Sequence, residues 1–208
     1  MSDFPIELDA ALAGRLARAL DVEAKIPRAL ETLGPVAGRD VYLVDGQPDG
    51  LRATQLEGLG ARVVVGGPID GQPTADIADG SMDVVVGCWT SFRGVVPTEM
   101  AAVARILRPG GRLLALHDYG RDDVSLLSGD LPEYRLWSRR DGPFLAAGFR
   151  IRVIHCFWTF PDLAAAHAFL RGAFGAAGEA LAETLKRPRL TYNVGVYHRT
   201  RGGDDPAG

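Results

Sequence analysis

The chain has 208 residues, of which 47% are hydrophobic and 24% are charged, a balance typical of one globular domain with a sizeable core. Its formal net charge is −3 and its sequence pI is about 5.8. This balance lacks the basic surplus with which proteins bind phosphate backbones, so we expect no nucleic-acid partner. Because no apolar run reaches membrane-spanning length and no amino-terminal signal pattern is present, we expect no membrane partner and a cytoplasmic location.

The first segment carries a helical pattern over residues 6–33, where apolar residues recur mainly at four-residue spacing. Pro27 suits the first turn of a second helix, and the Gly-Pro pair at 34–35 ends it. Residues 1–35 are therefore predicted to be an N-terminal helical extension. It could cover the binding crevice, or it could pack on a second copy of the chain to form a homodimer.

From residue 40 onward, short apolar runs alternate with helical patterns. Strands are predicted at 41–44, 62–65, 83–88, 112–117, 150–160 and 191–198, and helices at 51–58, 97–107, 132–147 and 162–185. This alternation predicts an α/β fold with a doubly wound, mostly parallel, Rossmann-like sheet of six to seven strands. We assign residues 36–200 to this domain and residues 201–208 to a disordered tail.

The two cysteines, Cys88 and Cys156, each lie inside an apolar strand pattern. Neither is surrounded by Cys/His spacing of the kind that binds a metal, so we predict two reduced thiols in the core and no metal site.

Two turns flank the strand at 83–88 and the helix that follows it. The motif DGSMD occupies residues 79–83, and the motif LRPGGRL occupies residues 107–113. Proline ends a helix, and glycine permits the left-handed turn into the next strand. With these motifs the segment 78–118 resembles the class I S-adenosylmethionine-dependent methyltransferase family. That family usually has an aromatic residue at the position that Met82 occupies here. The resemblance covers residues 36–198 in element order, and it implies an antiparallel last strand.

In that family a glycine-rich loop after the first strand leaves room for the amino-acid portion of S-adenosylmethionine. In one alignment the loop is VDGQPDG at residues 44–50, and Gly46 and Gly50 match the first and last glycines of the family motif. A proline replaces the middle glycine of that motif, and a valine replaces its acidic residue. In a second alignment Asp45 is the acid that holds the ribose hydroxyls, and the loop lies upstream. We prefer the first alignment, because the helix and strand that follow fit it and the upstream residues are helical.

The cofactor motif is shortened in either alignment. A βαβ unit needs roughly 30 residues, whereas only residues 67–82 separate two consecutive predicted strands. One unit of the family is therefore missing, together with part of the adenosine pocket. Asp70 and Asp76 lie in this stretch and could contact adenine or ribose; the alternative is that they are ordinary turn carboxylates.

Ligands of open α/β sheets bind outside the carboxyl ends of the strands, so the residues that follow each strand are candidates for the site. Cys88 and Trp89 end one strand and could line the cofactor, while Phe92 could contact the substrate. Packing in the crevice is the alternative for these side chains, and the two alternatives remain open.

The densest group of ionisable residues follows the strand at 112–117. His117 could serve as a general base oriented by Asp118, and Tyr119 completes the catalytic candidates. Tyr119 and Arg121 could contact the substrate. The alternative is a polar loop mouth, in which His117 only bonds to the backbone.

The resemblance implies methyl transfer from S-adenosylmethionine to a small-molecule substrate. The degenerate cofactor motif leaves an alternative: a methyltransferase-like domain without cofactor that acts as a partner or scaffold protein, or that carries a different activity. No Walker loop, GxSxG, HExxH or GxGxxG motif points to other enzyme classes.

Overall fold

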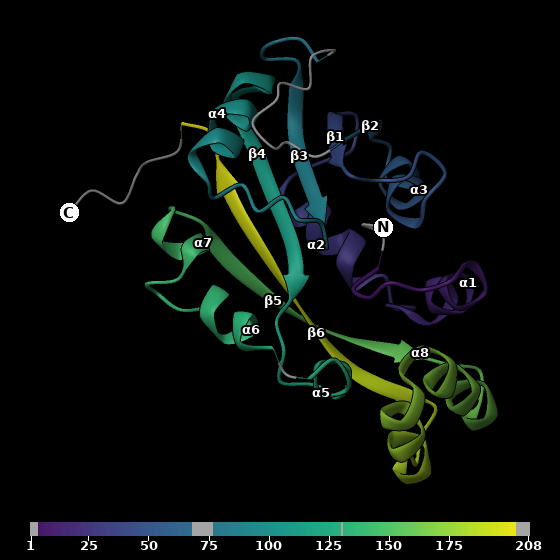
Figure 1. Ribbon diagram of the computed structural model, residues 1–208. Helices are drawn as coiled ribbons and strands as arrows, with labels where there is room; N and C mark the ends of the chain where they lie inside the picture. Colours follow the sequence, from purple (N-terminus) through teal and green to yellow (C-terminus); the bar gives the residue numbers. More distant parts are fainter. Residues whose placement is uncertain (1–3, 68–76, 130, 203–208) are drawn as a thin grey trace.

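The computed structural model describes residues 4–67, 77–129 and 131–202, and it shows one six-stranded sheet with helices on both faces (Figure 1). The strands are β1 (Asp40–Val44), β2 (Arg62–Gly66), β3 (Met82–Cys88), β4 (Leu107–Asp118), β5 (Arg150–Thr159) and β6 (Arg189–Thr200). The helices of this described part are α1 (Ala10–Ala19), α2 (Lys25–Leu33), α3 (Leu51–Gly58), α4 (Pro97–Ile106), α5 (Asp123–Leu127), α6 (Pro132–Trp137), α7 (Pro143–Ala146) and α8 (Leu163–Thr184). The predicted α/β class is confirmed.

The strand order is β2-β1-β3-β4-β6-β5. The pairs from β2 to β4 are parallel, whereas β6 is antiparallel to both β4 and β5. The mostly parallel sheet with an antiparallel last strand is therefore confirmed. Five strands end along one edge, which we call the carboxyl edge; the edge where they begin is the amino edge.

The position of β1 agrees with the first alignment of the glycine-rich loop. β1 pairs with β2 on one side and with β3 on the other. Residues 4–39, which precede it, contain α1, α2 and one isolated bridge between Leu20 and Trp158, but no strand. The second alignment requires an additional strand there, and the described residues do not contain it.

The apolar side chains form two clusters, one on each face of the sheet, because neighbouring residues of a strand point to opposite faces. Val41 and Leu43 of β1 belong to the first cluster, and Tyr42 and Val44 belong to the second. Residues of α1, α2, α3 and α8 complete the first cluster, and residues of α4 and α7 complete the second. The front helices α1 and α2 therefore share a core with the sheet.

The turn after α4 differs from the prediction. The helix ends at Ile106, and β4 already begins at Leu107, which pairs with Met82. The pairing then shifts, so that Arg112 is the partner of Val84 and the Pro-Gly-Gly residues lie in a bulge within β4. Glycine is needed at 111, because a Cβ there would lie 2.9 Å from a backbone oxygen. The Pro-Gly-Gly motif therefore forms a bulge in a strand instead of a turn between helix and strand. At Leu107 the hydrogen bonds of the sheet outweigh the helical pattern of the preceding residues.

The single helix predicted over residues 132–147 is wrong. The structure has two short helices there, α6 and α7, separated by residues 138–142. Pro143 is the first residue of α7, and a proline disfavours helical backbone in the residue before it. Gly142 approaches the carbonyl oxygen of Leu136 so closely that a Cβ would lie 2.2 Å from it. This close turn folds α7 back beside α6.

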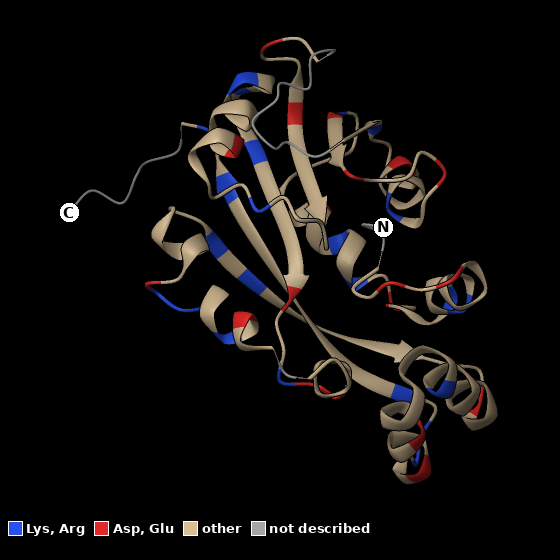
Figure 2. Cartoon of the chain, viewed as in Figure 1, with Lys and Arg blue, Asp and Glu red and all other residues tan. Residues whose placement is uncertain are grey.

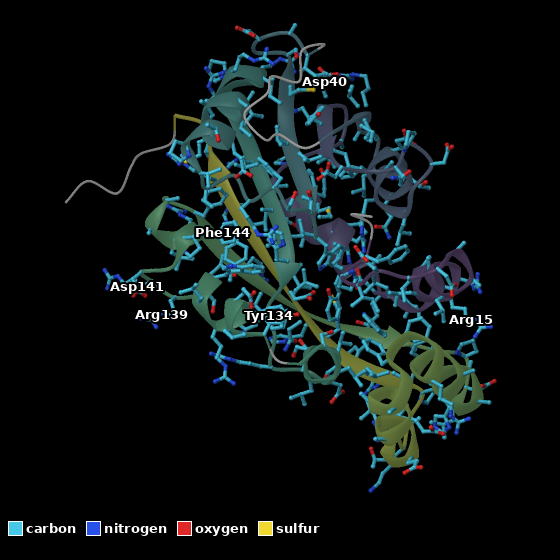
Figure 3. The ribbon with its side chains drawn as sticks, viewed as in Figure 1. Arg15, Asp40, Tyr134, Arg139, Asp141 and Phe144 are labelled. Atoms are coloured by element: carbon cyan, nitrogen blue, oxygen red, sulfur yellow. The ribbon has the colours of Figure 1, made fainter. Side chains whose placement is uncertain are left out.

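Ion pairs and hydrogen bonds between charged side chains stabilise the amino edge of the sheet, where β1 begins at Asp40 (Figure 3). One oxygen of Asp83 accepts the backbone N–H of Asp40 at 3.0 Å and the guanidinium of Arg108 at 2.6 Å. Arg108 also bonds to the Asp40 carboxylate at 3.0 Å. Burial alone would raise the pKa of Asp83, but the backbone N–H and Arg108 outweigh burial and lower it. These bonds hold β1, β3 and the start of β4 in register.

We expect the substitution Asp83→Asn to lower the free energy of unfolding by about 1 kcal/mol, because it removes the ion pairs with Arg108 and Arg39 and weakens a partly buried hydrogen bond. Chemical denaturation measures the change. The effect should be largest above pH 3.8 and should shrink as the wild-type carboxylate becomes protonated below that value. Asp79→Asn is the matched control, since the Asp79 side chain pairs with Arg105 but is 79% exposed. Equal losses of unfolding free energy in Asp83→Asn and Asp79→Asn would contradict the stabilising role of Asp83 at the amino edge.

Candidate active site

The carboxylate of Asp118, the last residue of β4, lies at the centre of a cluster at the carboxyl edge. It accepts the indole N–H of Trp89 at 3.0 Å, the Tyr192 hydroxyl at 2.5 Å and the Tyr134 hydroxyl at 3.2 Å. The three donors come from the turn after β3, from β6 and from α6. Figure 3 shows Tyr134 beside the ends of the strands, far from Asp40 at the amino edge. We call Asp118 and its three donors the Asp118 cluster.

The environment of Asp118 gives its carboxyl group an unusual acidity. Burial raises the pKa of Asp118 to about 6, although the hydrogen bonds from Tyr192, Trp89 and Tyr134 favour the ionised form. An ionised carboxylate has about four acceptor positions, so three donors leave room for one more. A carboxylate with a pKa near neutrality and a remaining acceptor position is suited to accept a proton.

Trp89 takes part in two further contacts. Its backbone is left-handed, with φ of 49°. The guanidinium of Arg52, buried on α3, lies 4.8 Å from the centre of the indole ring, and the Tyr192 ring stacks on it with a centroid distance of 6.4 Å. The protein therefore fixes the indole from several sides. Trp89 lies at the carboxyl edge, as predicted, and its ring contacts the side chains of Arg52 and Tyr192.

The turn after β1 connects to the same edge. The carboxylate of Asp45 accepts a hydrogen bond from the Thr90 hydroxyl, which follows Trp89. Gly46 packs closely on its own strand, since a Cβ there would lie 2.5 Å from Leu43 Cδ2. Gly50 caps α3 without a side chain, so the positive end of the helix dipole faces this turn. The predicted loop residues Asp45, Gly46 and Gly50 thus lie near Trp89, but Gly46 serves packing.

The structure does not bring the side chains of His117 and Asp118 together. Adjacent residues of a strand point to opposite faces. The His117 ring therefore points away from the Asp118 carboxylate, and it lies 5.1 Å from the Trp137 ring and 5.8 Å from Phe144. Its Nε2 has no hydrogen-bond partner among the described residues. Burial lowers the pKa of His117 well below 6.5, and the charge of Arg93 acts in the same direction. A neutral ring enclosed in this way does not reach a substrate at the edge.

The other predicted residues divide between core and surface. Cys88 and Phe92 are each 1% exposed, so their side chains lie in the core. Arg121 is exposed, and its guanidinium lies 5.6 Å from the centre of the Tyr119 ring. These last two residues lie at the solvent side of the carboxyl edge.

The remaining predictions concern the metal, the thiols and the shortened loop. Asp70 and Asp76 lie outside the described residues. Neither cysteine forms a disulfide. Within the described ranges, no group of three or more acidic, histidine or cysteine side chains could hold a metal ion, and no helix is long and apolar enough to cross a membrane.

Sequence reasoning did not identify several residues of this edge: Arg52, Thr90, Tyr134 and Tyr192. Tyr192 is separated from Asp118 by 74 residues and meets it only because β6 pairs with β4. Nothing in the local pattern of the last strand marks Tyr192 as different from a core residue. Arg52 carried a detectable signal, since an arginine in an apolar position of a short helix is unusual.

Comparison with solved structures supports the architecture. A protein from Anaeromyxobacter dehalogenans, provisionally named a type II methyltransferase, matches with a TM-score of 0.51 and 18% identity over 85% of this chain and 95% of its own. The chain has the fold of the class I methyltransferases.

Two weaker matches also have methyltransferase names. An S-adenosylmethionine-dependent methyltransferase from Thiobacillus denitrificans, bound to S-adenosylhomocysteine, has a TM-score of 0.46 and 17% identity over 93% of this chain and 99% of its own. Geranyl diphosphate C-methyltransferase from Streptomyces coelicolor has a TM-score of 0.44 and 13% identity over 86% and 76%. No protein-family model and no curated protein matches the sequence.

We expect His117 to make the fold sensitive to mild acid. The folded protein resists protonation of His117, whereas the unfolded chain binds the proton near pH 6.5, so the free energy of unfolding should fall as the pH drops below 6.5. His117→Leu should lose less stability than the wild type between about pH 7.5 and about pH 5 in denaturant titrations. His155→Gln, at an exposed position, is the control. Parallel curves for the wild type and His117→Leu would contradict the assignment.

Proposed function

We propose that the protein binds S-adenosylmethionine at the carboxyl edge of its sheet and transfers the methyl group to a small-molecule acceptor. The observation that carries the proposal is the Asp118 carboxylate, which has a raised pKa of about 6 and lies at the end of β4 in a methyltransferase fold. Open α/β sheets bind their ligands at this edge. The solved structure that matches best in fold among those described above is named a methyltransferase, which supports a methyl-transfer reaction. None of the acceptors of the matched proteins is assigned to this chain.

The residues of the β1 turn fit part of the cofactor. The amino-acid portion of S-adenosylmethionine carries a carboxylate and an amine, and the turn offers a helix N-terminus at Gly50 and a carboxylate at Asp45 as charge partners. The end of β2 offers Gly66 and Gly67 where an acidic residue would hold the ribose. A Cβ at Gly66 would lie 2.0 Å from the Tyr42 hydroxyl, whereas one at Gly67 would have no neighbour within 4 Å among the described residues. The ribose would therefore lie over Gly67.

Asp118 would act on the acceptor. When bound, S-adenosylmethionine supplies a methyl group already activated by its sulfonium charge, so the protein needs only to align the acceptor and remove its proton. Asp118 would accept the proton of an acceptor O–H or N–H at its remaining position, while Trp89 and Tyr192 hold the carboxylate in place. Tyr119 and Arg121, on the solvent side, would contact the acceptor.

A second candidate function is supported by the packing around Trp89. Arg52 places a positive charge against the indole ring of Trp89, which is predicted to line the cofactor, and this charge would repel a sulfonium. A domain whose site repels the sulfonium in this way would serve as a partner or scaffold protein without cofactor. The binding experiment below separates the two functions.

We expect S-adenosylmethionine and S-adenosylhomocysteine to stabilise the protein against thermal unfolding, by about 2.7 kcal/mol at one hundred times the dissociation constant. Asp45→Asn should weaken binding, because it removes the charge partner of the cofactor amine. Asp141→Asn is the control, since Asp141 pairs with Arg139 on an exposed surface. If neither ligand stabilises the wild type at millimolar concentration, methyl transfer is wrong and the scaffold function is favoured.

We expect the rate of methyl transfer to rise with pH through about 6, because Asp118 accepts a proton only when it is ionised. Asp118→Asn should reduce the rate about 10²–10⁴-fold while leaving cofactor binding intact. Tyr134→Phe removes a hydrogen bond that favours the ionised carboxylate, so it should shift the pH profile to higher pH. An unchanged profile in Tyr134→Phe, or full activity in Asp118→Asn, would exclude Asp118 as the base.

A further inference from the structure

A hollow lies between α1 and the start of α8, at the carboxyl end of the edge strand β5. Its volume is about 630 Å³, within the range of small-molecule sites. In the strand order, β6 separates β5 from β4 and its Asp118. The lining consists of two arginines of α1 and six residues with small or apolar side chains: Arg15, Arg18, Ala19, Thr159, Phe160, Pro161, Ala165 and Ala168.

Among the described residues that line the hollow, only the two arginines are charged. Arg15 and Arg18 are exposed and three positions apart, so both lie on the same side of α1. Figure 2 shows basic residues on α1, and Figure 3 labels Arg15 there. Within residues 4–67, 77–129 and 131–202, neither guanidinium has a hydrogen bond or an ion pair. The adjacent acid Asp162 is occupied at the N-cap of α8, where it accepts the N–H of Ala165 at 2.7 Å. Two like charges this close repel each other, and an anion between them would relieve the repulsion.

The remainder of the lining is apolar. Phe160 is 5% exposed and forms part of the core below the hollow. Ala165 and Ala168 lie three positions apart on α8, and their small side chains leave the space open. A ligand that fits this lining has an anionic group for the arginines and an alkyl body for the apolar floor.

We propose that this hollow binds an anionic amphiphile with a carboxylate head and a short alkyl chain. The carboxylate accepts paired N–H groups from Arg15 and Arg18, the geometry for which guanidinium is suited. The alkyl chain lies along Phe160 and Ala168. This site is independent of the proposed methyl transfer, because it uses no residue of the Asp118 cluster.

Titration calorimetry of the full chain with sodium octanoate tests the proposal, with octan-1-ol as the uncharged probe of equal length. We expect octanoate to bind, and Arg15→Ala and Arg18→Ala each to weaken it about tenfold. Arg140→Ala, at an exposed site outside the hollow, should bind as the wild type does. Equal binding of octanoate and octanol, or octanoate binding that persists in the double variant Arg15→Glu/Arg18→Glu, would overturn the carboxylate site.

A second variant tests the alkyl portion. Ala168 is exposed on α8, so Ala168→Trp should fold normally and fill the hollow, abolishing octanoate binding while both arginines remain. Unchanged binding in Ala168→Trp would overturn the proposal. A free amphiphile and a lipid surface share this chemistry, so co-sedimentation with vesicles containing an anionic phospholipid forms a separate arm. Arginine-dependent pelleting with the vesicles, without octanoate binding, would assign the arginines to a membrane surface and overturn the pocket.

Discussion

The carboxylate of Asp118 joins three segments that are distant in the sequence, and the arrangement of the carboxyl edge depends on it. A charged group partly withdrawn from water is costly unless donors replace its hydration. Trp89, Tyr134 and Tyr192 supply those donors, and each is itself a large side chain with a single polar atom. The cluster therefore ties the turn after β3, α6 and the last strand to one point, and it still leaves an acceptor position for a ligand.

Side chains along β4 alternate between the two faces of the sheet, so the consecutive residues His117 and Asp118 lie in chemically different environments. Asp118 lies among hydrogen-bond donors, whereas His117 lies among aromatic rings. Both groups are pushed toward neutrality by burial, the acid by a raised pKa and the base by a lowered one. The acid keeps a donor network and lies at a ligand-binding edge, so it is the better candidate for proton transfer.

β2 is the edge strand of the sheet opposite to β5. Nothing among the described residues pairs with its outer side, and Val64 on this strand is 38% exposed. Arg62 at its start carries a charge that discourages pairing with another chain and bonds to Asp40. The end of β2 is also where the ribose of the proposed cofactor would lie, beside Gly66 and Gly67.

The sequence by itself determined the α/β class, the strands and the motifs at 79–83 and 107–113, because apolar periodicity and turn residues act over short distances. It also located the carboxyl edge and Asp118, since the ends of parallel strands meet. Only the tertiary structure decided that Asp118 accepts hydrogen bonds from Tyr134 and Tyr192, that the His117 ring points away from Asp118, and that Arg52 contacts Trp89. Those contacts depend on strand pairing and on the packing of helices over the sheet, which join residues whose local patterns are no different from those of ordinary core or surface positions.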